Sequence, residues 1–562
     1  MKRNFLFMSM LASLFFAGCS QEEIAPGGED NGEANTSYLS VNLVSSDVMG
    51  TRADALVYED GSDVENHVSN VRFYFFNGLG GAVNVKLQNG RYVNYYDWTP
   101  GGGDQSDGTK PDDDIESKLK ATIVINTKAG DGIPQRIAAV LNPTGLDNNS
   151  KSLTDLKNIV ADYATSGENG LTSEGRFVMF NSVGGGGKDF STTPIEKKHL
   201  CKTEELALAN PVTIYVERSV AKVRVTLDAG LGFSDNKLAL KDKDGKDLKV
   251  GGEQVYLQLN NWGLTAETSE GRLVKKINPG WEGEWWYTPY RSFWAINSMS
   301  ATNVYHSYND ITTSFSEENA ENALYTNENA QLTDINGNAG NAKKRTKFIL
   351  KGTLCKANGD PFTIVRHLGV HFADTPSNTE ADNLTELKKS ILDVLSANNL
   401  KYYYSTESGR KQIGTNELQI LVAPQSENED SKNNCYVYAQ LTDAAAGKTW
   451  FTSLEGGTEI TDAAKVINGK LADKNIVDRA LVWNSGMTYY YQEIKHLNGF
   501  TGVVRNHIYG VNVQKIAGLG TPVYKPDEII YPEHPEENDH YIAAQINILS
   551  WRVVNENYDL EW

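Results

Sequence analysis

The sequence predicts a mainly β protein with two β-sandwich domains, a few short helices and a C-terminal strand beyond the second domain. Three observations predict this class. Short segments in which apolar and polar residues alternate, separated by Gly, Asn and Asp, run through most of the 562 residues. Glycine (50) and tyrosine (27), which favour turns and strands, far outnumber methionine (7). Strong helical periodicity occurs in only two places, at residues 153–163 and 384–395.

The composition excludes several classes of function. The chain has 53 basic and 72 acidic residues, and its net charge of −19 would repel nucleic acids and anionic lipid surfaces. We therefore expect no nucleic-acid partner. The four cysteines show neither the close spacing of a zinc site nor the density of a disulfide scaffold, and they are Cys19, Cys201, Cys355 and Cys435.

The N-terminal segment has the features of an export signal. Two basic residues precede an apolar run from Phe5 to Ala17, which is too short to span a bilayer permanently. Residues 1–18 therefore read as a signal peptide. The following Gly18-Cys19-Ser20 resembles a bacterial lipobox, in which the cysteine is acylated and the preceding peptide is removed. The alternative is an ordinary signal peptide followed by an incidental cysteine.

Residues 19–52 are predicted to form a propeptide that contains one strand. An acidic, glycine-rich tether at residues 21–35 leads into a segment with Leu39, Val41 and Leu43 on one face. The alternation indicates a half-buried strand. A polar loop with a single arginine, Arg52, then precedes Ala53, and such exposed loops are where proteases cut folded proteins. The alternative is a loop that contains an arginine by chance.

The body of the chain is predicted to form an N-terminal sandwich at residues 53–211 and a C-terminal sandwich at residues 212–520. In the segment 212–227 the apolar positions change from even to odd near Arg218, which requires a bulge, a bend or a crossing between domains. The second domain is large, and a polar insertion at residues 312–347 accounts for part of the excess. Mostly antiparallel sandwiches fit the strand-like segments, which include residues 71–76, 121–126, 136–141, 255–259, 348–354, 436–441 and 488–494.

The C-terminal end is predicted to be a linker followed by an isolated strand. Residues 521–540 contain Pro522, Pro526, Pro532 and Pro535 in an acidic context, so we expect an extended linker that packs no core. Residues 541–562 are apolar on alternating faces, and a strand held away from its own domain needs a sheet to join. Its apolar residues include Ile542, Ala544, Ile546, Ile548, Leu549, Trp551, Val553, Tyr558, Leu560 and Trp562.

The residues give no support for an enzyme, a cofactor or a metal site. The run from Gly184 to Lys188 departs from a phosphate-binding loop and reads as a flexible loop. The segment from Asp242 to Asp247 lacks the positions of a calcium loop and reads as a hairpin turn. His367 and His371 lack the intervening glutamate of a zinc protease and would lie about 13 Å apart in a strand.

Four features together resemble the type V pilins, or fimbrilins, of Bacteroidetes. They are the lipobox, the strand that ends before an arginine, the sequence VERSVAKV at residues 216–223, and the apolar strand beyond the proline-rich linker. The sequence is most like the major subunit of the Porphyromonas short (minor) fimbriae. The detailed likeness lies in residues 503–509, 549–553 and 558–560, whereas residues 230–480 diverge. A paralogous stalk or accessory subunit is therefore an open alternative.

The resemblance implies transthyretin-like Greek-key sandwiches and a specific assembly process. The precursor would be a palmitoylated lipoprotein attached through Cys19 to the outer membrane until an Arg-specific protease cuts between Arg52 and Ala53. Loss of the strand around Leu39, Val41 and Leu43 would open a groove, which the C-terminal strand of the next subunit fills by donor-strand exchange. The donor residues would be Ile546, Ile548, Leu549, Trp551, Val553, Tyr558 and Leu560.

The resemblance also implies partners and a location. The mature chain would form a homopolymeric surface fimbrium, joined by anchor, tip or accessory subunits, and would support adhesion to host or bacterial surfaces, biofilm formation and virulence without any cofactor.

An alternative function is a surface lipoprotein that binds a glycan or a host protein without polymerising. It would use exposed aromatic residues at Trp281, Trp285 and Trp286. A fimbrial anchor or tip protein is a third reading, although an anchor would keep its lipid and a tip would need no donor strand.

Overall fold

The computed structural model describes most of the chain. The described residues are 36–46, 61–101, 115–181, 191–276, 297, 302–315, 322–329, 344–376, 384–422, 436–496, 502–532, 540–549 and 553–556, without residues 128, 129, 131 and 243. Within these residues no helix is long and apolar enough to cross a membrane.

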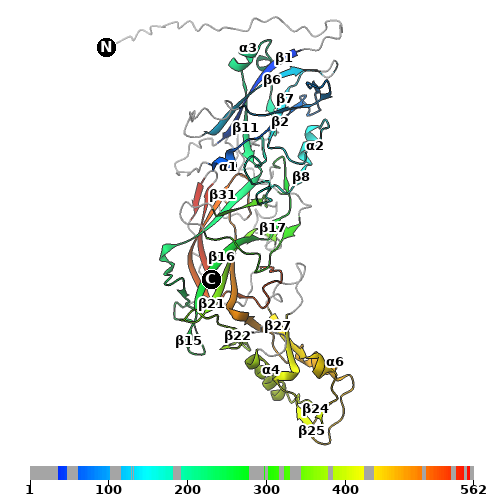
Figure 1. Ribbon diagram of the computed structural model, residues 1–562, viewed down its shortest axis with the longest axis vertical. Coiled ribbons are helices and arrows are strands. Elements are labelled where there is room, and N and C mark those ends of the chain that lie inside the picture. The colour runs from blue at the N-terminus through cyan, green and yellow to red at the C-terminus, as the bar shows by residue number, and fades with distance from the viewer. Residues whose placement is uncertain are drawn as a thin grey trace, which may run out of the picture.

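The molecule is elongated and mainly β, with short helices, which confirms the predicted fold class (Figure 1). The N-terminal sheet lies at one end, two further sheets occupy the middle, and a smaller mixed unit lies at the other end. Each of these three parts has its own large cluster of buried apolar side chains.

The N-terminal part is built on an eight-stranded sheet in the order β5-β2-β7-β9-β11-β1-β6, with β10 paired to β7. All six residues of β2 are buried, because other parts of the chain cover both faces of the sheet there. The strands are β1 (Thr36–Ser46), β2 (Val71–Phe76), β5 (Tyr95–Trp98), β6 (Ile115–Asn126), β7 (Arg136–Leu141), β9 (Met179–Asn181), β10 (Thr193–Pro194) and β11 (Val212–Arg218).

Short capped helices flank this sheet. Ser62, Ser152 and Thr203 cap α1 (Asp63–Asn66), α2 (Leu153–Lys157) and α3 (Glu204–Ala209) by accepting backbone N–H bonds. The helix predicted at residues 153–163 ends early, because the chain after Asn158 becomes β8 (Val160–Ala161) and pairs with β18 (Gly271–Arg272). Tertiary pairing therefore overrides the helical periodicity in its second half.

The central part is a sandwich of two five-stranded sheets around one core. One sheet has the order β20-β12-β31-β33-β34 and the other has the order β13-β16-β21-β30-β32. Their strands are β12 (Val220–Leu227), β13 (Leu238–Ala239), β16 (Tyr256–Thr265), β20 (Ala323–Asn327), β21 (Lys347–Cys355), β30 (Met487–Glu493), β31 (Ile508–Gly518), β32 (Thr521–Pro522), β33 (His540–Leu549) and β34 (Val553–Glu556).

The chain between β21 and β30 forms the third part, and its separate core differs from the single C-terminal sandwich predicted for residues 212–520. Leu387, Ile391 and Leu395 of the predicted second helix, which is confirmed as α4, pack there with Trp450. Its elements are β22 (Ile364–His367), β23 (Val370–Ala373), α4 (Thr385–Ala397), β24 (Tyr403–Thr406), β25 (Gly409–Gln412), β26 (Leu418–Val422), β27 (Tyr436–Leu441), α5 (Asp443–Ala446), β28 (Trp450–Phe451), α6 (Ala463–Leu471) and β29 (Ala480–Trp483).

Short strands connect the main elements, together with 3₁₀ turns. The short strands are β3 (Val85–Lys86), β4 (Tyr92–Val93), β14 (Lys249–Val250), β15 (Glu253–Gln254), β17 (Glu267–Thr268) and β19 (Asn303–Val304). The 3₁₀ turns are at Lys197–His199, Ala229–Leu231, Thr415–Glu417 and Asn484–Gly486.

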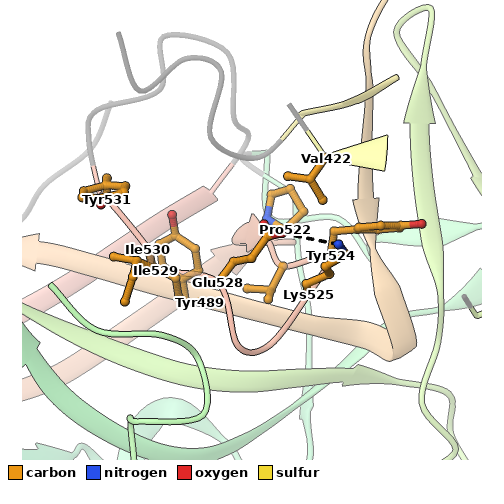
Figure 2. Close-up of a pocket in the computed structure, with 10 residues that line it drawn as sticks. Val422, Tyr489, Pro522, Tyr524, Lys525, Glu528, Ile529, Ile530 and Tyr531 are labelled. Carbon is orange, nitrogen blue, oxygen red and sulfur yellow. Dashed lines mark ion pairs between the residues drawn. The ribbon is translucent and has the colours of Figure 1, made fainter. Parts of the chain in front are cut away.

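The first half of the predicted linker is packed, which corrects the expectation that residues 521–540 form no core. Val523 and Ile530 are 5% and 7% exposed and pack against Tyr489 of β30. Figure 2 shows this segment around a small pocket, where Val422 of β26 also contributes and Lys525 pairs with Glu528. Prolines suit an extended chain, and the apolar residues between them hold that chain against the sheets.

Candidate assembly site

The predicted removable strand, β1, lies inside the N-terminal sheet. It pairs antiparallel with β6, with Thr36 opposite Asn126. On its other side it pairs parallel with β11, with Val41 opposite Val212. Its neighbours along the sheet are therefore β6, which begins at residue 115, and β11, which begins at residue 212. The N-terminal strand thus closes a sheet whose other members lie far away in the sequence.

Residues 39–43 of β1 are buried on both faces of the strand. Leu39, Val41 and Leu43 are 0%, 0% and 2% exposed within the N-terminal core. Ser40 and Asn42, which the alternation predicted to face solvent, are 1% and 8% exposed. Helix α3 lies against β1 and covers part of the strand, so the expected half-buried strand is more deeply enclosed than its sequence indicates.

The start of β1 is also joined to the segment before α3. Tyr38 donates its backbone N–H to the carbonyl of Cys201 at 2.8 Å, and Cys201 donates back to Tyr38 at 3.0 Å. Cys201 is 6% exposed and not in a disulfide. The burial of this thiol therefore depends on a segment that is in contact with β1.

Removal of β1 would leave a groove in the sheet. Strands β11 and β6 would then be separated by two strand spacings, or about 9.6 Å, with unpaired backbone groups on both walls. Three large apolar side chains would leave the core, at a cost of roughly 5 to 9 kcal/mol in lost burial. Such a groove would accept an extended segment with apolar residues at alternate positions.

The predicted donor strand, β33, pairs antiparallel with β31 of its own chain. Ile546, Ile548 and Leu549 lie opposite Val511, Tyr509 and Ile508. This differs from the expectation of a strand held away from its own domain. The physical reason is that β12 occupies one side of β31, so the other side offers an open edge to the nearest strand.

Beyond β33, Val553 lies in β34, which returns along β33. The other predicted donor residues lie outside the described residues and are Trp551, Tyr558 and Leu560. The proposed processing residues Cys19, Arg52 and Ala53, the three candidate tryptophans at 281, 285 and 286, and the glycine-rich run at 184–188 also lie outside them.

The two histidines considered as metal ligands lie on different strands of one hairpin, so the estimate for a single strand does not apply. His367 is 2% exposed and hydrogen-bonded to Ser390 at 2.7 Å, whereas His371 contacts the ring of Trp483. Burial lowers the pKa of His367, which favours a neutral structural imidazole. No group of side chains suited to a metal occurs among the described residues.

The segment from Asp242 to Asp247 is a hairpin turn, as predicted. Lys241 and Asp247 form an antiparallel bridge, and Gly245 donates its backbone N–H to Asp242 at 3.0 Å.

The phase change near Arg218 is a crossing between the N-terminal and central parts, as one of the predicted alternatives had it. Strand β11 belongs to the N-terminal sheet and β12 to the central sandwich, where β12 pairs parallel with β31. Each half can therefore bury its apolar positions in a different core.

A buried ionic cluster holds this crossing, and the apolar periodicity of the sequence does not reveal it. Glu65 of α1 pairs with Lys222 at 3.0 Å and accepts a hydrogen bond from Tyr325 at 2.8 Å. Arg218 donates to the carbonyl of Glu65 at 3.1 Å and to the side chain of Asn66. Burial opposes ionisation of Glu65, but Lys222 and Arg218 outweigh it and lower the pKa of this carboxyl.

A second buried ionic cluster lies beside the first. Arg505 and Glu328 are each fully buried, and Arg505 donates from Nε and Nη2 to the same Glu328 oxygen, Oε2, at 3.1 and 3.0 Å. Lys275 pairs with Glu217 at 2.8 Å. The sequence hints at this cluster only through the charged residues inside the apolar runs 212–223 and 503–509. Apolar periodicity does not reveal which of these charges are buried.

The chain matches known fimbrial proteins at both ends. Residues 37–201 match the family described as major fimbrial subunit protein (FimA), and residues 482–557 match the family described as major fimbrial subunit protein type IV, fimbrillin, C-terminal. The first match begins within β1, and the second includes β31, β33 and β34. These matches confirm the predicted resemblance to fimbrial subunits, which are structural proteins of the cell surface.

No curated protein matches the chain. Among solved structures, similarity extends to a candidate cell adhesion protein from Bacteroides eggerthii, at 11% identity and a TM-score of 0.36, covering 93% of this chain and 98% of that chain. The tip fimbrial protein Mfa3 from Porphyromonas gingivalis is similar at 12% identity and a TM-score of 0.31, covering 92% and 100%. A fimbrial assembly protein from Parabacteroides distasonis is similar at 12% identity and a TM-score of 0.29, covering 59% and 91%.

Proposed function

We propose that this chain, which matches major fimbrial subunits at both ends, is a structural subunit that polymerises by donor-strand exchange. The precursor is exported as a lipoprotein acylated at Cys19 and is cut between Arg52 and Ala53 by an Arg-specific protease. The observation that carries the proposal is the position of β1. It lies inside the N-terminal sheet, yet it ends at Ser46, before the proposed cleavage site, so one cut detaches it from the rest of the chain.

The donor is the C-terminal strand of the next subunit. Its proposed groove-filling residues, Ile546, Ile548, Leu549, Trp551, Val553, Tyr558 and Leu560, offer the alternating apolar pattern that the groove requires. We take the donor arm to begin at residue 533, after the buried Pro532. Fully extended, residues 533–562 reach roughly 100 Å, which is enough to cross a neighbouring subunit.

The position of β33 within its own chain is compatible with donor-strand exchange. On its own chain, β33 lies near the edge of a sheet, followed only by β34. In the groove of a neighbour it would be flanked by β11 and β6, and both of its faces would be covered as those of β1 are. The exchange therefore moves the strand from a position next to the edge strand β34 to a position enclosed within a sheet, which favours polymer over monomer.

The mature subunit then forms a surface fimbrium with anchor, tip and accessory subunits. Residues 1–52 contain three basic and six acidic residues, so cleavage changes the net charge from −19 to −16. The acidic excess belongs to the polymer. Adhesion to host or bacterial surfaces and biofilm formation follow from exposure of the fibre, and the lipid anchor is transient.

Replacement of Arg52 tests the proposal. Arg52→Ala should prevent polymer formation on a gel run without boiling, whereas Arg91→Ala, at an exposed arginine in the N-terminal part, should leave the polymer intact. N-terminal sequencing of wild-type surface material should give Ala53. An acylated Cys19 as the mature N-terminus, or unchanged polymer in Arg52→Ala, would refute the cleavage step and favour the non-polymerising lipoprotein.

Deletion of residues 541–562 tests the donor separately. The truncated chain should be secreted and cleaved as a folded monomer, because the described core residues of all three parts precede residue 541. Continued polymerisation would contradict the donor assignment.

A further inference from the structure

Lys275 and Glu217 form a buried pair between two segments of the chain. Glu217 lies near the end of β11, and Lys275 follows β18, whose next two residues, Leu273 and Val274, pack into the N-terminal core. The Lys275 Nζ lies 2.8 Å from Glu217 Oε2, and the side chains are 1% and 2% exposed. Water therefore has little access to either reactive group.

The carboxyl of Glu217 is incompletely satisfied. Its Oε1 atom is buried and accepts no hydrogen bond from the described residues. Burial raises the pKa of Glu217 and lowers the pKa of Lys275, and the attraction between the two groups only partly opposes this. Each shift acts toward the neutral form of its group, and the neutral amine is the nucleophilic form of lysine.

The Arg505–Glu328 pair fixes the surroundings. Arg505 donates to the backbone carbonyls of Arg272 and Leu273, which lie shortly before Lys275 in the chain. Arg505 and Glu328 also act electrostatically on both Glu217 and Lys275. The amine is therefore held against the carboxyl by a rigid and fully buried frame, and such positioning is what a bond-forming step requires.

We propose that Lys275 and Glu217 join through an intramolecular isopeptide bond. The ammonium passes one proton to the carboxylate across their hydrogen bond, and the amine lone pair then forms a bond to Cδ. The bond from Cδ to one carboxyl oxygen breaks, and the hydroxyl leaves with a second proton from nitrogen as water. The product is a neutral amide that keeps one N–H, so charge and atoms balance without any oxidant or cofactor.

The bond would close a loop across the junction of the N-terminal and central parts. Its two ends are 58 positions apart in the sequence, and one of them lies on β11, the strand that borders the groove. The link forms within one chain and does not depend on polymerisation. If the proposed donor strand pulls on the groove, the cross-link would keep β11 attached to the segment that Arg505 holds.

Intact mass spectrometry of the secreted monomer without residues 541–562 tests the inference directly. We expect a chain lighter than its sequence by one water. The full sequence mass would overturn the proposal and leave an ordinary buried ion pair. Because the monomer is measured, failure of donor-strand exchange cannot be confused with failure of the cross-link.

Peptide mapping and matched variants locate the bond. Trypsin should release a branched peptide in which residues 203–218 are joined to residues 273–276, since a modified Lys275 is not cut. Lys276→Met, at the exposed neighbour, should keep the mass deficit, whereas Lys275→Met should abolish it. Glu217→Gln would lose ammonia and give the same final mass as wild type. Separate linear peptides from wild type would refute the assignment without any variant.

Discussion

The position of β1 predicts that Leu39 contributes to stability in the precursor but not in the assembled polymer. Leu39 of β1 and Leu156 of α2 are both 0% exposed and belong to the same N-terminal core. Replacing either by alanine should destabilise the precursor by about 2 to 5 kcal/mol, because burial is lost and a cavity is left. For this part of the molecule, that corresponds to a decrease in melting temperature of roughly 5 to 15 °C.

The two variants should differ after cleavage. Leu39 is removed with the propeptide and the donor strand takes its place, so Leu39→Ala polymer should melt like wild type, whereas Leu156→Ala polymer should stay destabilised. The assay is thermal unfolding of uncleaved precursor and of washed polymer for each variant. Equal destabilisation of both polymers, or a Leu39→Ala precursor as stable as wild type, would refute the model in which β1 is replaced.

Three further predictions follow from individual buried groups. The Cys201 thiol should react slowly with a maleimide in the precursor, faster after cleavage and slowly again in the polymer, because the segment that holds it contacts β1. The buried Cys355 serves as the control and should stay unreactive throughout. A constant rate of Cys201 labelling would contradict the opening of the groove. The folded pKa of Glu65 is lowered, so its ionised form adds stability above its unfolded pKa that is lost as pH falls through the folded pKa. Glu65→Gln should therefore be less stable at neutral pH and lose less stability on acidification in denaturant titrations, and an unchanged pH dependence would show that its ion pairs are not stabilising. Trp450→Ala should destabilise the third part by about 3 to 5 kcal/mol, because a large buried side chain is lost, and limited proteolysis measures this. The yield of polymer should not change. A loss of polymer would show that the third part is needed for assembly.

The sequence predicted the local features of β1 better than it predicted the strands with which β1 pairs. Alternation identified Leu39, Val41 and Leu43 as one apolar face, because side-chain period is a local property of a strand. It did not place β1 between β6 and β11, since those partners begin at residues 115 and 212. The change of phase near Arg218 was more informative, because a single strand that serves two cores must change its buried face.

Other features were missed for identifiable physical reasons. The third core combines α4 with strands of two to six residues, which were too short to indicate a separate unit within residues 212–520. The prolines of residues 521–532 suggested a free linker, but Val523 and Ile530 between them anchor it. The buried ionic clusters were invisible because charged residues such as Glu217 and Arg505 lie inside apolar runs, where periodicity treats them as exposed.

The segment of residues 212–227, which crosses between the N-terminal and central parts, connects the proposed groove to the sheet that holds the donor segment. Strand β11 borders the groove that would receive a donor, and β12 continues directly from it to pair with β31 along Lys222–Leu227. Strand β31 in turn holds the donor segment β33 of the same chain. A load carried from one subunit to the next would therefore pass through residues 212–227. The buried ionic clusters lie at the point where that strand changes face and its backbone pairing is interrupted. The Lys222–Glu65 and Arg505–Glu328 pairs there resist separation of the two parts, because opening the junction would leave buried charges unpaired.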